Sequence, residues 1–165
     1  MKRRLFLSAS AATLASPGLW AQNLPSGPVR IVVGFPPGGG TDALARVVAQ
    51  KLQGIWNTSI VIENRAGAGG NVGMEWVAQA TPDGHTLLLH HIGMATMPTL
   101  VRNIPFKVDS DFEYVGMVND VPMTLIGKPN LPANNFKELS AWVTANKGKI
   151  NLGNAGVGSA SHLCG

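Results

Sequence analysis

The residues best suited to binding chemistry are the glycines of GFPPGGGTD, residues 34–42. An apolar run over residues 29–35 predicts a buried strand, and a helical pattern follows over residues 43–52. Glycines 38–40 permit positive φ and let a ligand approach the backbone. The unpaired N–H groups at the start of the next helix attract anions, so we expect a carboxylate or phosphate there, with Thr41 as the N-cap. An ordinary capped turn without a ligand is the alternative.

The elements that position this loop alternate between strand and helix. The pattern predicts a strand at residues 59–63, a second glycine-rich loop at 64–71, a helix at 72–80, and a strand at 85–90 after the turn TPDG. Gly54 is the expected end of the first helix. This alternation predicts an α/β fold with a parallel, doubly wound sheet, in which ligands lie beyond the carboxyl ends of the strands.

The second half of the chain has a different texture, with prolines spaced between apolar runs. Strands are predicted at residues 112–118 and 123–128, and a helix follows near residues 136–143 and closes at Gly148. A strand at residues 150–153 then enters NAGVGS, residues 154–159, and a helix begins at Ser159. This order repeats the strand, glycine loop and helix start of the first half, so we expect two lobes that meet near residues 103–109.

The amino terminus has the features of an export signal. A basic head, KRR, precedes an apolar segment and the small residues before Ala21, so we expect cleavage after residue 21 and a periplasmic protein. Arg3 and Arg4 also fit a twin-arginine signal. Without these charges the chain is near neutral, which argues against a nucleic-acid partner. The single cysteine, Cys164, excludes an internal disulfide.

Other side chains and motifs are candidates for catalytic or metal-binding groups. His90 and His91 are adjacent, so they should face opposite sides of a strand, a poor geometry for a metal. His162 is expected to be a helix-terminus residue rather than a base. GFPPGGGTD lacks the lysine of a P-loop, and residues 156–161 lack the third glycine of a dinucleotide fingerprint. We therefore expect no cofactor and no metal; an enzyme acting on a small anionic or phosphorylated ligand at the glycine loops is the alternative.

Four stretches together resemble one family. PVRIVVGFPPGGGTD, IENRAGAGGNVG, TPDGHTLLL and NAGVGSASHLCG are similar to the tripartite tricarboxylate transporter solute receptors, the Bug or TctC family. The resemblance runs from about residue 28 to residue 165. It implies a periplasmic-binding-protein-like fold with two lobes around a cleft, no enzymatic activity, a small carboxylic acid as solute, and a membrane permease as partner.

The resemblance also implies which residues hold the solute carboxylate, partly through ordered water. The positions that match are Phe35, Gly39, Gly40, Thr41 and Asp42 in the first lobe, and Asn154, Ala155, Gly156, Gly158 and Ser159 in the second. Convergent N–H groups from two facing helix starts would suit such a group. His91 joins the expected contacts because HHIGM, residues 90–94, lies at the pocket. Relatives often carry small hydroxyl residues there, so the chemical identity of the solute's far end is left open.

The expected organisation follows from these interpretations. Residues 1–21 form the signal peptide, residues 22–103 the first α/β lobe, and residues 104–165 the beginning of the second. The resemblance implies a chain about twice as long, so we expect a C-terminally truncated fold that exposes apolar surface. A monomer is expected for the full-length protein.

Overall fold

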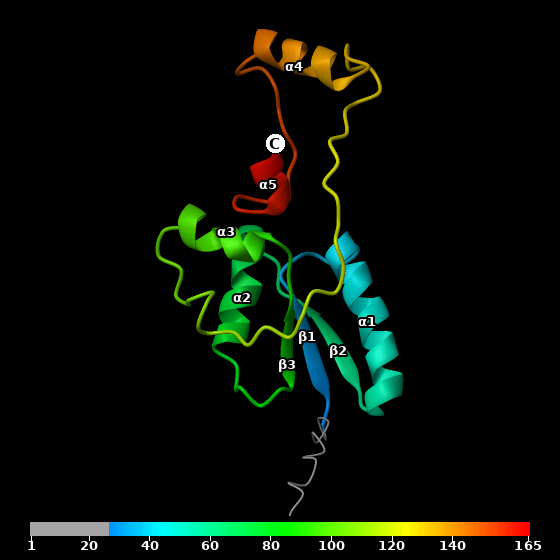
Figure 1. The fold of residues 1–165 in the computed structure, drawn as a ribbon, viewed down its shortest axis with the longest axis vertical. Coiled ribbons are helices and arrows are strands. Elements are labelled where there is room, and N and C mark those ends of the chain that lie inside the picture. Colours follow the sequence, from blue (N-terminus) through cyan, green and yellow to red (C-terminus); the bar gives the residue numbers. More distant parts are fainter. Residues whose placement is uncertain (1–26) are drawn as a thin grey trace, which may run out of the picture.

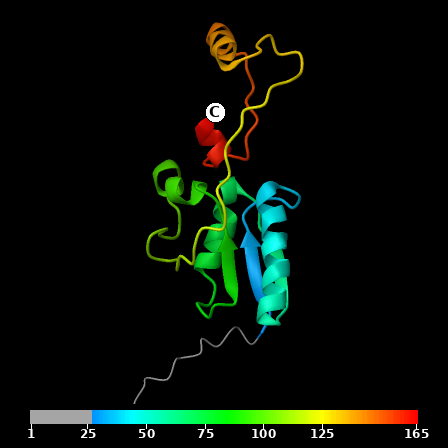
Figure 2. The ribbon, with the colours of Figure 1, turned by 45° about the vertical axis from the view of Figure 1, so that its right-hand side comes forward.

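The computed structural model describes residues 27–165, so the predicted export signal lies outside the described part. Three strands and most of the helices form one compact unit (Figures 1 and 2). In chain order the elements are β1 (Val29–Val33), α1 (Gly40–Trp56), β2 (Ile60–Asn64), the 3-10 turn η2 (Ala68–Gly70), α2 (Asn71–Ala78), β3 (Thr86–Leu89), α3 (Gly93–Leu100), α4 (Phe136–Ala145) and α5 (Ala160–Cys164).

The strands form a parallel sheet in the order β2-β1-β3. Ile31, in the central strand, lies opposite Ile62 in β2 and Leu87 in β3. Parallel strands need crossover connections, and α1 and α2 supply them on opposite faces of the sheet. The predicted α/β architecture with a parallel, doubly wound sheet is confirmed.

Each face of the sheet has its own core. On the α1 face, alternate residues of β1 pack against Ala45 and Ala49, with Trp56 at the edge. On the other face, Met74 and Met97 are completely buried. Phe106, Val108 and Phe112 pack with that second core. The chain therefore remains attached to the sheet up to residue 112, and the division into lobes at residue 103 stays a prediction.

One helix end was predicted wrongly, and one helix was not predicted. The first helix does not end at Gly54 but continues to Trp56, where Asn57 takes a left-handed conformation with φ 50°. Apolar packing of Trp56 outweighs the small cost of one helical glycine. The helix α3 was not predicted, because it contains Pro98 and follows a histidine pair that was assigned to a strand. Its burial of Met97 supplies the stability that its sequence lacks.

The strands predicted at residues 112–118, 123–128 and 150–153 are absent from the described structure, where these segments pair with no strand. Val115, Met117 and Ile126 are 92%, 86% and 89% exposed. An apolar run becomes a strand only where another strand bonds its backbone, and none lies beside these runs. The expectation of exposed apolar surface is confirmed. The predicted repeat of strand, glycine loop and helix start in the second half was wrong about the strand at residues 150–153, which is absent.

The extended segment leads to α4, which lies apart from the sheet, and the chain then returns to place α5 above the sheet edge (Figures 1 and 2). Within residues 27–165, no helix combines the length and the apolar character needed to cross a membrane.

Candidate functional site

The candidate site lies at the carboxyl edge of the sheet, where three connections leave parallel strands. Phe35 follows β1, Asn64 ends β2, and His90 follows β3. The helix α5 lies above the same edge (Figure 1). Because the strands are parallel, side chains distant in sequence meet at this edge, as predicted for a doubly wound sheet.

The first loop presents the start of α1 to solvent. Its N-cap is Gly39, without a side-chain cap, so the assignment of Thr41 as N-cap was wrong. The first helical bond runs from the N–H of Ala43 to the carbonyl of Gly39. No described residue accepts from the N–H groups of residues 40–42. These donors, at the positive end of a 17-residue helix, suit a carboxylate.

Only one of the three loop glycines has the expected left-handed backbone. Gly38 has φ 86°, whereas Gly39 has φ −78° and Gly40 is the first helical residue. A Cβ at Gly40 would meet no atom within 4 Å. The absence of a side chain at Gly40 therefore keeps the approach to the helix open, and it relieves no backbone strain.

Asp42 is 3% exposed and accepts four hydrogen bonds from the protein. The donors are the N–H of Gly38 at 2.9 Å, Nε and Nη2 of Arg46 at 3.0 Å each, and Nδ2 of Asn64 at 2.9 Å. The Arg46 guanidinium, followed by the Gly38 and Asn64 donors, holds the pKa of Asp42 well below its usual range. Its carboxylate stays ionised and fully paired.

Three aromatic rings lie in contact just after the ends of β1 and β3. Phe35 stacks on His91 with centroids 4.6 Å apart, and the two histidine rings lie 4.8 Å apart. The prediction that His90 and His91 face opposite sides of a strand was wrong, because β3 ends at Leu89 and the alternation ends with it. Among the described residues, no three His, Cys, Asp or Glu side chains form a metal-binding group.

Hydrogen bonds define the tautomers of the two histidines. Nδ1 of His91 accepts from the N–H of Gly93 at 2.9 Å, so its proton is on Nε2. Nδ1 of His90 lies 3.1 Å from the carbonyl of His91 and donates to it, which leaves Nε2 as a buried acceptor without a partner in the described structure. Burial lowers the pKa of His90 to about 4 and also lowers that of His91.

The second glycine-rich loop contacts both the His90 ring and the segment around Val157. Gly69 and Gly70 have φ 67° and 103°. A Cβ at Gly70 would lie 2.2 Å from Nε2 of His90, and one at Gly69 would lie 2.4 Å from the carbonyl oxygen of Val157. Both positions need glycine for backbone conformation and for space. This loop thus lies in contact with residues 156–159 and connects them to the unit that contains the sheet.

Several N–H groups of the 154–159 loop have acceptors within the loop or in α5. Ala155 donates to Oγ of Ser161 and Gly156 to Oδ1 of Asn154, at 2.9 Å each. Gly158 donates to Nδ1 of His162 at 3.4 Å, which places that histidine at a helix terminus as predicted. Ser159 is completely buried and caps α5. No described residue accepts from the N–H groups of residues 157, 160 and 161, so the expected convergence of N–H groups from two helix starts stays a prediction.

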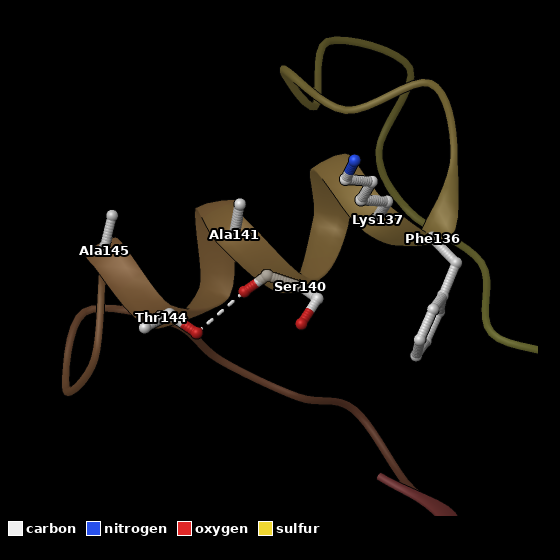
Figure 3. Close-up of a pocket in the computed structure, with 6 residues that line it drawn as sticks. All are labelled: Phe136, Lys137, Ser140, Ala141, Thr144 and Ala145. Atoms are coloured by element: carbon white, nitrogen blue, oxygen red, sulfur yellow. Dashed lines mark hydrogen bonds between the residues drawn. The ribbon is translucent and has the colours of Figure 1, made fainter.

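A wide hollow on α4 is a second candidate. It is lined by Phe136, Lys137, Ser140, Ala141, Thr144 and Ala145, all from one helix (Figure 3). Phe136 is 78% exposed, and the hydroxyl of Thr144 donates to the carbonyl of Ser140. The hollow lies far from the sheet edge (Figure 1) and holds a single charged group. It is an open helix face.

Sequence reasoning missed two residues that shape the first loop, Arg46 and Asn64. Arg46 had a usable signal, because an acid and a base four residues apart pair on one helix face. Asn64 had none, since its partners Phe35 and Asp42 lie 29 and 22 residues away.

Comparison with known proteins gives one family. The model of the tripartite tricarboxylate transporter family receptor, TctC, matches residues 44–165. A UPF0065 protein in the TAR-I ttuE-ttuC' intergenic region of Agrobacterium vitis is 43% identical over 86% of this chain and 41% of the relative. The chain spans about half the length of the curated relatives it matches.

Solved structures agree with that assignment. The periplasmic binding protein BugD is 46% identical, with a TM-score of 0.80 over 85% of this chain and 47% of BugD. MatC from Rhodopseudomonas palustris with bound malate is 33% identical, with a TM-score of 0.78 over 82% of this chain and 47% of MatC. The α/β unit is therefore a periplasmic-binding-protein-like fold.

Proposed function

Because the chain belongs to the tripartite tricarboxylate transporter receptor family, we propose that it is a solute-binding receptor of the periplasm. Its solute is a small carboxylic acid, held between the lobes at residues 22–103 and 104–165. The receptor then delivers this acid to the membrane permease of a tripartite tricarboxylate transporter. The observation that carries the proposal is the open start of α1, where free N–H groups meet solvent at the carboxyl edge of the sheet.

The carboxylate lies against the first loop at Phe35, Gly39, Gly40 and Thr41. The loop at residues 154–159 covers it from the other side, and water bridges the remaining gap. His91 contacts the far end of the solute, because its ring stacks on Phe35 and its Nε2 carries a proton. MatC was solved with malate bound, which supports a short dicarboxylate as the first probe.

A receptor is favoured over the enzyme alternative. The family model describes a receptor, and BugD is described as a periplasmic binding protein. At the candidate site the one carboxylate of the first loop is fully paired, and His90 is buried. A group that transfers protons must reach the proton it moves, and neither of these does.

Calorimetric titration with L-malate tests the proposal. We expect saturable binding of L-malate and no binding of its uncharged dimethyl ester. The NMR spectrum of malate should be unchanged after long incubation with the protein, because a receptor does not convert its solute. Ligand at 100 times Kd should stabilise the protein by about 2.7 kcal/mol. Equal binding of the ester would exclude carboxylate recognition. If neither malate nor a panel of other small carboxylic acids bound, the receptor function would be wrong.

Export and oligomeric state complete the proposal. The amino-terminal segment directs the protein to the periplasm, with Arg3 and Arg4 selecting the twin-arginine route. N-terminal sequencing of the periplasmic protein should place the cut near residue 21, and replacing both arginines with lysine should retain the protein in the cytoplasm. Unimpaired export would exclude that route alone. The receptor should elute as a monomer in gel filtration.

A further inference from the structure

Asp42 lies beside the proposed carboxylate site, yet it carries the same charge as the solute. It is buried, and its two oxygens already accept four hydrogen bonds. A second carboxylate close to an unpaired one would be repelled. The bidentate Arg46 neutralises this charge locally. The Asp42 carboxylate is therefore tolerated beside an anion site only because both of its oxygens are already paired.

Asn64 connects β2 to both ends of the loop. Its amide nitrogen donates to the carbonyl of Phe35 at 3.0 Å and to Oδ1 of Asp42 at 2.9 Å. An amide nitrogen has two hydrogens, and this geometry uses both. Asp42 in turn accepts from the N–H of Gly38. The loop from residue 35 to residue 42 is thus bonded at its start, its middle and its end.

We propose that the side chains of Asp42, Asn64 and Arg46 form a clamp that presets the first loop, and that these three side chains position the loop without touching the solute. This proposal rests on the proposed function. With the clamp in place, the free N–H groups of residues 40–42 need no ordering when the carboxylate arrives. Without it, the ordering cost would reduce affinity, by about tenfold if one loop segment must be fixed at binding.

The matched comparison is Asn64→Leu against Gln53→Leu. Nε2 of Gln53 donates to the carbonyl of Ile60 at 3.1 Å, so Gln53 also connects α1 to β2, but away from the loop. Each variant removes a bond between side chain and backbone, and both should lower Tm. Only Asn64→Leu should weaken L-malate binding about tenfold. Equal affinity losses, or none for Asn64→Leu, would overturn the clamp.

A second readout does not depend on the ligand. Hydrogen–deuterium exchange should accelerate at residues 35–41 in Asn64→Leu and in Arg46→Gln, because Asp42, which accepts from the Gly38 amide, loses one of the groups that hold it in place. The same peptide should be unchanged in Gln53→Leu. Arg46 has an exposed side chain, so Arg46→Gln should fold even if Asn64→Leu does not. Unchanged exchange in Arg46→Gln would count against the proposal.

The double variant Asp42→Asn/Asn64→Asp separates positioning from general stability. It restores a donor and an acceptor between positions 42 and 64 and keeps the charge within reach of Arg46, whose Nη2 lies 3.5 Å from Oδ1 of Asn64. We expect the double variant to exchange more slowly at residues 35–41 than either single variant. Additive effects would show that the pair does not act as one unit.

The clamp and the receptor function can fail separately. If wild-type protein binds no carboxylate but exchange responds as described, the clamp stands as a loop-ordering device and the receptor function is wrong. If wild-type protein binds L-malate and none of the clamp variants changes affinity or exchange, the receptor stands and the clamp is wrong.

Discussion

Phe35 and His91 stack with their ring centroids 4.6 Å apart and an angle of 26° between the rings. The first residue follows β1 and the second follows β3, so the stack joins two connections at the carboxyl edge of the sheet. His91 also accepts the first N–H of α3. One side chain therefore connects the first loop to α3, the helix that contacts Gly158.

His91→Ala should destabilise the protein by about 1–2 kcal/mol, because a hydrogen bond at a helix start and an aromatic pair are both lost. His91→Asn keeps an acceptor near Gly93 and should recover part of that loss. Urea denaturation followed by tryptophan fluorescence measures both. If the two variants were equally unstable, the bond to Gly93 would contribute nothing.

Gly40→Val should weaken L-malate binding without unfolding the protein. The added side chain meets no atom of the described structure within 4 Å, so it obstructs only the approach to the helix start. Ala43→Val is the matched control, since it adds bulk to the same exposed helical turn. Calorimetry of both variants should show reduced affinity for Gly40→Val alone, and normal affinity in that variant would exclude the first loop as the carboxylate site.

Stability should fall as the pH is lowered from about 6.5 to 4. Burial lowers the pKa of His90 to about 4, so in this range the unfolded chain binds a proton that the folded chain does not. The loss is on the order of 3 kcal/mol. His90→Asn keeps a donor for the His91 carbonyl and should flatten the dependence above pH 4. If stability depended on pH equally steeply in that variant, another titrating group would cause the loss.

Below pH 4 a second loss should follow from Asp42. Its pKa is held below the ordinary carboxyl value, so it stabilises the fold above that value and this stabilisation disappears as pH falls through the lowered pKa. Denaturant titrations between pH 4 and pH 2 should show a smaller decline in Asp42→Asn than in wild type. Parallel declines would indicate that other carboxylates dominate.

The segment at residues 113–135 should exchange its amide hydrogens within seconds, whereas β1 exchanges slowly. Its apolar side chains are exposed and its backbone has almost no partners. These exposed apolar side chains should also bind hydrophobic dyes. Exchange at residues 113–135 as slow as that of β1 would contradict this prediction.

The first half of the fold could be predicted because its signals are local. Continuous apolar runs between glycine-rich punctuation predict buried parallel strands, and spacing of three and four residues predicts the helices. β1 and β2 match their predicted positions to within two residues, and α2 to within two. The predicted loop at residues 34–42 lies at the carboxyl edge because every strand of a doubly wound sheet directs its connection there.

Long-range partners decided the rest. Residues 112–118 and 123–128 have the composition of strands, but a strand exists only where a second backbone satisfies its donors and acceptors. The sequence likewise left several roles open for Asp42, since a carboxylate next to a glycine loop can bind a ligand, cap a helix or pair internally. Only the positions of Gly38, Arg46 and Asn64 around it distinguish these roles.

The histidine pair shows the same division. Composition and order placed His90 and His91 after an apolar run at the sheet edge, and that position is correct. Their side-chain directions depend on β3 ending at Leu89 and on Gly70 leaving space for the His90 ring. Local patterns determine where strands, helices and loops occur because they depend on neighbouring residues. Side-chain environments depend on contacts between segments 20 to 90 residues apart, which only folding brings together.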